Sequence, residues 1–385
     1  MISTLHHTSL YHASRMSELG KLNWSSTFRH LGLGMVLVFV PIYLTQLGFS
    51  LSAIFGYFTQ IGVFWVLLIY PAYKATAVVG TNRMMAIGSF FALVYVATLL
   101  TLGQYGWPLW LLALSFASMV TPYWFALRVN FSKAVDHRKA GKQLGLTSAL
   151  ALAALGIAPA LGGIIAETLN PSALYVVAFS IVLLSVLPLL VGSQPTMSER
   201  PDLRRLRWRK VSADLVANGS LQIDDVLQSA VWPLLIFLVI PSYAGVGILS
   251  SVMVVAAIAT SLYVGRKEAN RGERHFIREG STLISLINGL RVLASNTTHI
   301  AGINFMSGIS HALLDTPYNT RYYRNADAEN RFEYVFAMQL ASALGWLLYA
   351  AILLGLSLII PSRTTVLTLG LVLAIPFSLL IPKIR

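Results

Sequence analysis

The sequence predicts an all-α integral membrane protein with twelve transmembrane helices in two six-helix bundles and both termini in the cytoplasm. Three observations predict this fold class. Hydrophobic residues make up 56% of the 385 residues and charged residues only 11%. Apolar stretches of about 20 residues, each long enough for one bilayer crossing, recur along the chain. Lys and Arg gather in alternate connections between these stretches, so the bilayer is the expected solvent of most of the chain.

Windows of apolar residues predict six helices before the longest hydrophilic stretch and six after it. The first six are expected over 24–46, 51–72, 84–102, 107–128, 143–166 and 172–192. The second six are expected over 213–240, 244–264, 280–296, 298–319, 333–360 and 364–382. The predicted parts of the chain are a cytoplasmic tail over 1–21, a bundle over 22–192, a basic linker over 193–212 and a bundle over 213–382.

Basic residues set the predicted orientation. Of the 28 Lys and Arg residues, all but Arg291 and Arg363 fall in the even-numbered connections or the tails, and the positive-inside rule places those segments in the cytoplasm. The net charge of +13 is spread over helix ends instead of forming one basic domain, so we expect contacts with membrane lipids and none with nucleic acid. Arg291, in the ninth predicted helix, is expected to snorkel outward.

Some chemistry is excluded by composition. The chain has no cysteine, which rules out disulfides and thiolate chemistry. Its first 20 residues lack the apolar core of a signal peptide, and the histidines there belong to a solvated tail rather than a metal cluster. We predict no metal site, no cofactor and no catalytic residue, and the chain has no G-x-x-x-x-G-K-[ST] run for ATP.

Small residues and a proline mark the fifth predicted helix: Gly156, Pro159, Gly162 and Gly163. Such residues let helices approach closely and bend. The loop before that helix carries an acid, a base and a glycine: Asp136, Arg138 and Gly141. With the layout of six plus six helices, these motifs resemble those of the major facilitator superfamily over nearly all of residues 24–382. The resemblance implies gating and packing roles for the motif residues, and a central cavity lined by helices one, four, seven and ten.

One face of the seventh predicted helix is polar, at steps of three and four residues: Asp214, Asn218, Gln222, Asp225, Ser229 and Trp232. An ionised carboxylate at membrane depth costs roughly 2.5–3.5 kcal/mol, so Asp225 is expected to face water, a partner or the bundle interior as a substrate or proton-coupling site. Asp224, about 100° around the helix, is expected to contact a neighbouring helix. The sequence allows the two roles to be exchanged. It also allows the alternative that both acids lie at the cytoplasmic interface.

A second polar face belongs to the tenth predicted helix: Asn304, Gly308, His311, Asp315 and Tyr318. His311 and Asp315 are one turn apart, so they predict either a proton relay or a structural hydrogen bond.

The first and fourth predicted helices add His30, Arg29, Trp124 and Arg128 to the candidate site. Arg29 is read either as a binder of a substrate anion or as a side chain that snorkels to the cytoplasm. Trp124 and Trp232 are candidates for stacking on a substrate.

These residues predict a secondary active transporter, a monomer in the cell membrane, that moves a small solute by alternating access. Proton coupling is a further hypothesis, and an apolar, aromatic cavity favours export over uptake. A lipid or lysolipid translocator shares the pattern. From other classes, an intramembrane enzyme using His311 and Asp315 and a non-transporting sensor are alternatives. The chain lacks H-E-x-x-H and G-x-S-x-G motifs for the former, and its loops are too short to hold a signalling domain for the latter.

Overall fold

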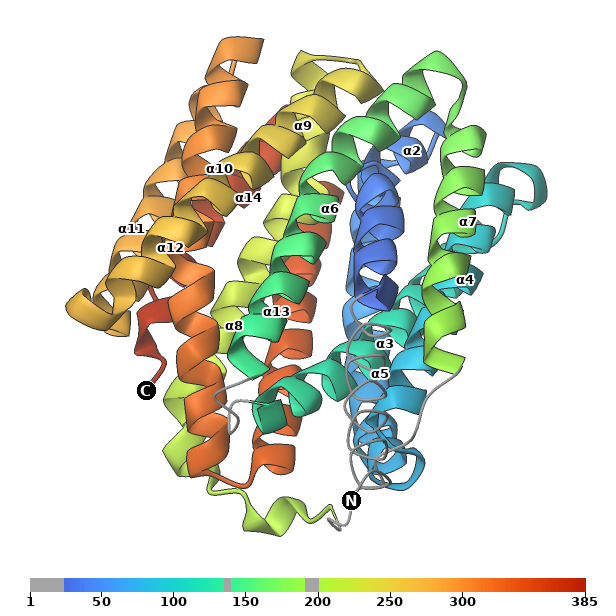
Figure 1. Ribbon diagram of the computed structural model, residues 1–385. Helices are drawn as coiled ribbons and strands as arrows, with labels where there is room; N and C mark the ends of the chain where they lie inside the picture. Colours follow the sequence, from blue (N-terminus) through green and yellow to red (C-terminus); the bar gives the residue numbers. More distant parts are fainter. Residues whose placement is uncertain (1–23, 135–139, 191–200) are drawn as a thin grey trace, which may run out of the picture.

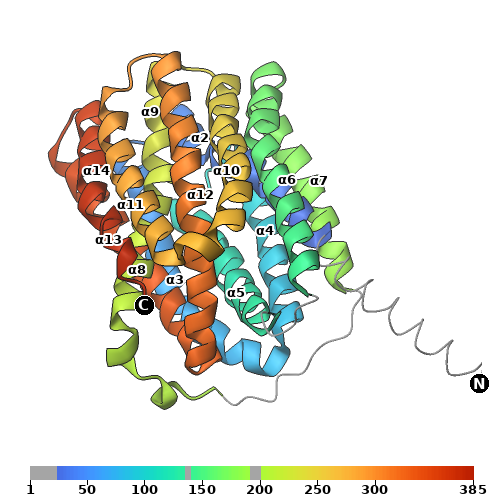
Figure 2. The same ribbon diagram turned by 60° about the vertical axis from the view of Figure 1, so that its left-hand side comes forward.

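The computed structural model describes residues 24–134, 140–190 and 201–385. Every regular element in these ranges is helical, so the all-helical fold class is confirmed. Figure 1 shows the helices up to residue 190, the N-terminal half, to the right of the helices after residue 200, the C-terminal half. Figure 2 shows α11 to α14 coming forward on the left, with α6 and α7 on the right.

The N-terminal half opens with a helix over 24–37 that continues, after a two-residue turn, into α2 (Val40–Gln46). Pro41 lies in the first turn of α2, where its fixed φ suits a helix and its missing N–H costs nothing. The other helices of this half are α3 (Leu51–Val79), α4 (Thr81–Tyr105), α5 (Leu109–Ala134), α6 (Ala140–Thr168) and α7 (Pro171–Leu190). Gly80, with φ of 91°, separates α3 from α4 because a side chain is strained in that conformation.

The C-terminal half opens with α8 (Trp208–Val226), which passes through a π-helical segment (Leu227–Val231) into α9 (Trp232–Val239). The helices that follow are α10 (Tyr243–Arg271), α11 (Glu273–Leu290), α12 (Thr297–Ala328), α13 (Arg331–Ile359) and α14 (Arg363–Ser378). Short 3₁₀ turns lie at Leu203–Arg205, Arg291–Leu293 and Ile381–Lys383.

Eight helical spans among the described residues are long and apolar enough to cross a membrane: Trp24–Gln46, Leu51–Val79, Thr81–Tyr105, Leu109–Asn130, Trp208–Val239, Tyr243–Ser261, Arg331–Ile359 and Arg363–Lys383. α6 and α7 contribute shorter apolar stretches, whereas α11 and α12 hold many of the polar residues of the site below. Twelve crossings therefore stay a prediction. α3 and α12 end later than expected, at Val79 and Ala328, because backbone hydrogen bonding continues beyond the apolar window.

The two halves meet along two helix pairs, α6 with α10 and α3 with α13. Glycines allow the closest approaches. A Cβ added at Gly163 would collide with the backbone oxygen of Tyr243, and one at Gly247 with the backbone oxygen of Pro159. Within the N-terminal half, Gly162 lies equally close to the backbone oxygen of Met35. Since backbone cannot yield as a side chain does, these glycines set the distance between the helices.

We expect Gly163→Ala to lower the free energy of unfolding by about 1–3 kcal/mol, because the new methyl group overpacks against α10 backbone. Gly156→Ala is the matched control in the same helix, since its Cβ would meet a side-chain carbon of Val254 at 3.3 Å, which can move. Thermal unfolding in detergent measures both variants. Equal losses would contradict the assignment of Gly163 to the close approach.

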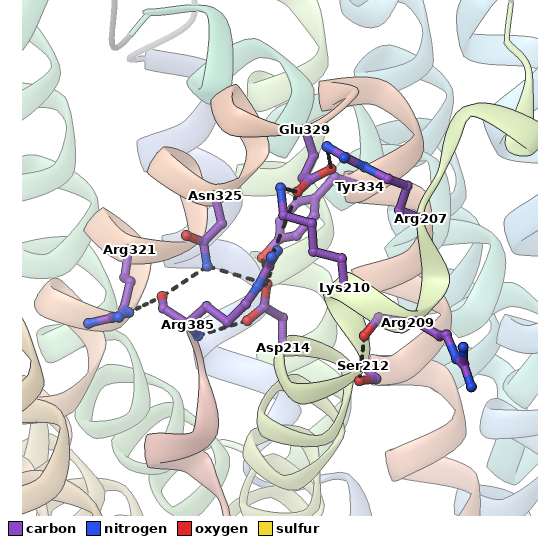
Figure 3. A network of polar contacts seen from close by, with 10 residues as sticks. All are labelled: Arg207, Arg209, Lys210, Ser212, Asp214, Arg321, Asn325, Glu329, Tyr334 and Arg385. Atoms are coloured by element: carbon purple, nitrogen blue, oxygen red, sulfur yellow. Dashed lines mark hydrogen bonds and ion pairs between the residues drawn. The ribbon is translucent and has the colours of Figure 1, made fainter.

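A polar network holds the linker end of the C-terminal half together, as Figure 3 shows. At its centre is Asp214 of α8, fully buried, whose Oδ2 accepts hydrogen bonds from Tyr334 Oη at 3.1 Å, Arg385 Nη2 at 3.1 Å and Asn325 Nδ2 at 3.3 Å. Asp214 therefore ties α8 to α12, α13 and the last residue of the chain and is not directed into a cavity. The described part of the linker, 201–207, holds only a 3₁₀ turn.

Glu329, at the end of α12, is the acidic residue of this network that has the most basic neighbours. Its carboxylate lies 2.5 Å from Lys210 Nζ, 3.5 Å from Arg207 Nη2 and 3.7 Å from Arg385 Nη1. Partial burial by itself raises the pKa of Glu329, but the hydrogen bond to Lys210 and the three positive charges outweigh it and hold the pKa below its usual value.

A carboxylate with a lowered pKa stabilises the fold above its unfolded pKa of about 4.3, and the stabilisation is lost as the pH falls through the folded pKa. We therefore expect Glu329→Gln to cost about 1 kcal/mol at pH 7 and to match the wild type near pH 3. Glu279→Gln, which removes an exposed partner of His275 within one helix, should cost less. Thermal midpoints across the pH range test this, and a pH-independent difference would argue against it.

Candidate transport site

The two neighbouring acids of α8 have different surroundings. Asp224 is buried, and its Oδ2 lies 3.3 Å from Nε2 of His311 on α12. Its Oδ1 accepts a hydrogen bond from Asn288 Nδ2 on α11 at 3.4 Å. As expected from its angle on the helix, Asp224 contacts neighbouring helices.

Asp225 is exposed, and its Oδ2 accepts a hydrogen bond from Gln222 Nε2 at 2.7 Å. Within electrostatic range are Arg128 of α5, from the other half, and Asp315 of α12. Asp225 thus lies near charged groups of both halves of the molecule, whereas the contacts of Asp224 lie within the C-terminal half.

Arg291 completes the buried network around Asp224. Its Nη2 donates to Gln228 Oε1 at 3.0 Å and Ser307 Oγ at 3.1 Å, and its Nη1 donates to Asn288 Oδ1 at 3.0 Å. Arg291 is only 2% exposed, so the expectation that it snorkels outward is wrong. Three polar side chains inside the C-terminal half compensate the guanidinium for lost water, which an apolar helix surface could not do.

The face predicted for helix seven is split by the π-helical segment, which adds a residue to one turn. Gln228 lies in this segment, and its Nε2 is 3.1 Å from His311 Nε2. After the segment, Trp232 is buried: its Nε1 donates to Asn304 Oδ1 at 2.7 Å, and the Arg291 guanidinium carbon lies 4.7 Å from its ring centre. Trp232 and Asn304 therefore support the network from inside the C-terminal half.

Asn218 is buried with every amide group used. Its Nδ2 donates to Met338 O and Ser342 Oγ, both at 2.7 Å, and its Oδ1 accepts from Tyr318 Oη at 3.1 Å. The side chain joins α8 to α12 and α13, is buried, and has both of its N–H donors in use within the C-terminal half.

His311 and Asp315 share a helix but form no ion pair within 4.0 Å among the described residues. The imidazole is directed to Asp224 and Gln228, while Asp315 is exposed. The pair expected from spacing is replaced by a pair between helices, since the His311 side chain reaches the Asp224 carboxylate of α8.

Helices one and four contribute aromatic and basic groups. Arg29 is buried with its guanidinium carbon 3.9 Å from the Tyr123 ring centre, and its Nη1 donates to Gly88 O at 3.5 Å. It neither snorkels nor faces the C-terminal half. Nδ1 of His30 lies 2.7 Å from Ser26 O, and its ring packs edge-on against Trp124.

The sequence of residues 22–350 matches the family model described as Major Facilitator Superfamily. The chain belongs to the major facilitator superfamily. The family model covers most of the chain, in agreement with the family resemblance that the glycine and proline motif indicated.

Solved structures of transporters have the same fold as this superfamily member. The nucleoside transporter NupG aligns with a TM-score of 0.67 at 12% identity, covering 95% of this chain and 97% of that one. A bacterial homologue of the human drug peptide transporters PepT1 and PepT2 aligns with a TM-score of 0.65 at 10% identity, covering 95% and 97%. At such identities the likeness shows the fold alone. No curated protein matches this chain in sequence.

In this superfamily member, the halves touch at both ends of the bundle. At the end opposite the linker, Tyr243 Oη donates to Gln46 Oε1 at 2.6 Å and Tyr243 N donates to Glu167 Oε2 at 2.7 Å. At the linker end, Glu333 Oε1 accepts from Tyr73 Oη at 3.3 Å and from the backbone N of Asp202 at 3.0 Å. The two Tyr243 contacts and the Tyr73–Glu333 contact join the two halves. The contact between Asp202 and Glu333 joins the linker to the C-terminal half.

The motif residues of the fifth predicted helix lie in α6, where Gly163 and Pro159 contact α10 and Gly162 contacts the first helix. Gly141 also lies in α6, whereas Asp136 and Arg138 lie outside the described residues.

A separate recess lies at the end opposite the linker, between α2, α3, α9 and α14. Its lining is mostly apolar, with Phe49, Phe237 and Leu367 among the residues. None of the acids discussed above borders it, so this recess is not the candidate site.

Sequence reasoning missed Arg291, Asn288 and Gln228 as members of the network. Spacing carried a signal for them, because Asn288 and Arg291 are three residues apart and Gln228 is four after Asp224, which puts each pair on one helix face.

We expect Asn218→Ala to lower the free energy of unfolding by about 1–3 kcal/mol, since it leaves buried partners on α12 and α13 without a hydrogen bond. Gln222→Ala is the control, because the Gln222 amide bonds to the exposed Asp225. Thermal unfolding in detergent compares them. A smaller loss for Asn218→Ala than for Gln222→Ala would show that the Asn218 contacts are not structural.

Proposed function

We propose that this superfamily member is a secondary active transporter of the cell membrane that moves a small solute by alternating access and couples the movement to protons through Asp225. The observation that carries the proposal is the exposed Asp225, which lies within electrostatic range of Arg128 of one half and of Asp224 and Asp315 of the other. An ionisable residue within a transmembrane helix, facing the interior, marks an ion or substrate pathway.

The chemistry of coupling follows from charge. Closing the halves around an ionised Asp225 removes a carboxylate from water, which is costly unless the charge is neutralised. A proton bound to Asp225 removes this cost, as does a cationic group of a solute. Occupancy of Asp225 therefore shifts the equilibrium between the open and closed arrangements of the halves.

Asp224 has a different part in the proposal. Its Oδ2 lies 3.3 Å from His311 Nε2, its Oδ1 accepts from Asn288, and Asn288 in turn accepts from the cation Arg291, so its surroundings lie inside the C-terminal half. The C-terminal half thus moves as a unit, while the surroundings of Asp225 change between the open and closed arrangements.

The contacts between halves supply the two gates of such a cycle. Opening at the linker end requires breaking Tyr73–Glu333, and opening at the far end requires breaking Tyr243–Gln46 and Tyr243–Glu167. A few polar contacts at each end suit an equilibrium between states of similar energy.

The expected preference for export rests on an apolar, aromatic cavity. The surroundings of Asp225 are charged instead of apolar and do not favour export over uptake. The proposal is therefore for coupled transport, and its test measures flux in both directions.

A solute is first found as a compound that raises the thermal midpoint of the purified protein, from a panel of drugs, sugars, amino acids, nucleosides and lysolipids. Stabilisation by lysolipids alone would favour a lipid translocator instead.

With that solute in proteoliposomes, we expect Asp225→Asn to abolish transport driven by a pH gradient in either direction while counterflow exchange continues. Asp327→Asn is the control, because Asp327 pairs with Arg331 within the linker end of the C-terminal half. Solute flux with and without the gradient is the measurement. Gradient-driven flux that survives in Asp225→Asn would remove Asp225 from coupling.

A further inference from the structure

The basic residue of α5 that faces the C-terminal half lies against a tyrosine. The guanidinium carbon of Arg128 is 4.8 Å from the ring centre of Tyr322 on α12, so the ring face and the cation attract each other. α5 belongs to the N-terminal half and α12 to the C-terminal half. The pair therefore bridges the boundary that opens and closes in the proposed cycle.

Several hydrogen-bonding groups at this contact have no partner of good geometry among the described residues. Nε and Nη1 of Arg128 are both buried without one, and so is the hydroxyl of Tyr322. The Tyr322 side chain is fully buried. A buried guanidinium N–H without an acceptor is among the most costly unsatisfied groups in a protein, and more so at membrane depth.

Two buried arginines differ from Arg128 in their hydrogen bonds. Among the described residues, Arg291 has a partnerless Nε but donates from both Nη atoms to three side chains, and Arg29 donates to a backbone oxygen. Around Arg128 the neighbours on α12 are Tyr318, Tyr322 and Tyr323, and the charged group in range is Asp225. Arg128 forms no ion pair within 4.0 Å with any acid in the described part of the chain.

We infer that Arg128 and Tyr322 form a subsite for an oxyanion, a carboxylate or phosphate group, of the transported solute. Two guanidinium nitrogens and a phenol hydroxyl can donate hydrogen bonds to the oxygens of a carboxylate or phosphate. The inference rests on the proposed function, because the donors come from opposite halves and a bound anion would join them only in the state in which α5 touches α12.

The subsite also narrows the substrate class. A solute held at Arg128 by an anionic group extends toward Asp225, so a second, neutral or cationic part of the solute suits that end. The aromatic rings on α12 favour a flat or apolar body next to the anion.

The test uses the purified full chain in detergent, with inorganic phosphate or sodium benzoate titrated against sodium chloride at matched ionic strength. We expect at least one of the two probes to raise the thermal midpoint of the wild type. Arg128→Gln and Tyr322→Phe should each weaken the apparent affinity about tenfold or more.

The matched control is Tyr123→Phe. Tyr123 is also a buried tyrosine stacked on an arginine, with a hydroxyl that has no partner of good geometry among the described residues, but Arg29 beside it does not face the other half. We expect this variant to bind the probe as the wild type does. Tyr322→Phe removes a single oxygen, so its loss of binding is readable even where Arg128→Gln fails to fold.

Three results overturn the inference: no stabilisation by either probe, stabilisation that both variants retain, or stabilisation by short-chain phosphatidylglycerol alone, which would assign the donors to a lipid headgroup. Failure of the subsite is separable from failure of transport. Proton-driven flux of a solute without oxyanion binding would support the proposed function and contradict the subsite. Oxyanion binding without gradient-driven flux of any solute would support the subsite and contradict the proposed function.

Discussion

A charge inside the bilayer must find its partners within the protein, and the C-terminal half is arranged around this constraint. Arg291, Asp224 and His311 lie on or beside three different helices, and Asn288 and Gln228 connect them by hydrogen bonds. Because each group would be costly to leave alone, the network fixes α8, α11 and α12 relative to one another. The same constraint acts at the linker end, where Asp214 joins α8, α12 and α13.

Against this background, two charged groups at the boundary between the halves stand out. Asp225 is exposed next to its buried neighbour, and Arg128 has two buried nitrogens without acceptors among the described residues. They come from opposite halves and lie within electrostatic range of each other. Internally matched charges hold a half rigid, whereas charges whose partners lie across the boundary respond to its opening. This division gives a physical basis for the proposed coupling between the two halves.

Close packing of backbone supplies the complementary requirement. Gly163 and Gly247 bring α6 and α10 into contact at backbone distance, and Gly62 does the same for α3 against Leu347 of α13. Small residues at these positions let the helix backbones approach each other directly. The hydrogen bonds of Tyr243 and Glu333 at the two ends are few beside this long contact, so the ends are the places where the halves separate at least cost.

Much of the architecture was determined by the sequence. The thickness of a bilayer sets the length of an apolar window, so helical segments and their connections were predictable, and the glycine and proline motif of residues 156–163 indicated the family. The angle of about 100° between Asp224 and Asp225 placed them on different faces of one helix but left open which of them contacts a neighbouring helix. Helical periodicity, however, describes only the face that a residue occupies on its own helix.

Which helix lies against that face was decided by the tertiary structure. His311 meets Asp224 instead of Asp315 because its side chain reaches across to α8, and Arg291 is directed inward because Gln228 and Ser307 offer acceptors there. The π-helical segment breaks the period that placed Trp232 on the same face as Asp225. Pairings between distant segments depend on the packing of whole helices, whose interlocking surfaces are a property of the assembled bundle and not of any one stretch of sequence.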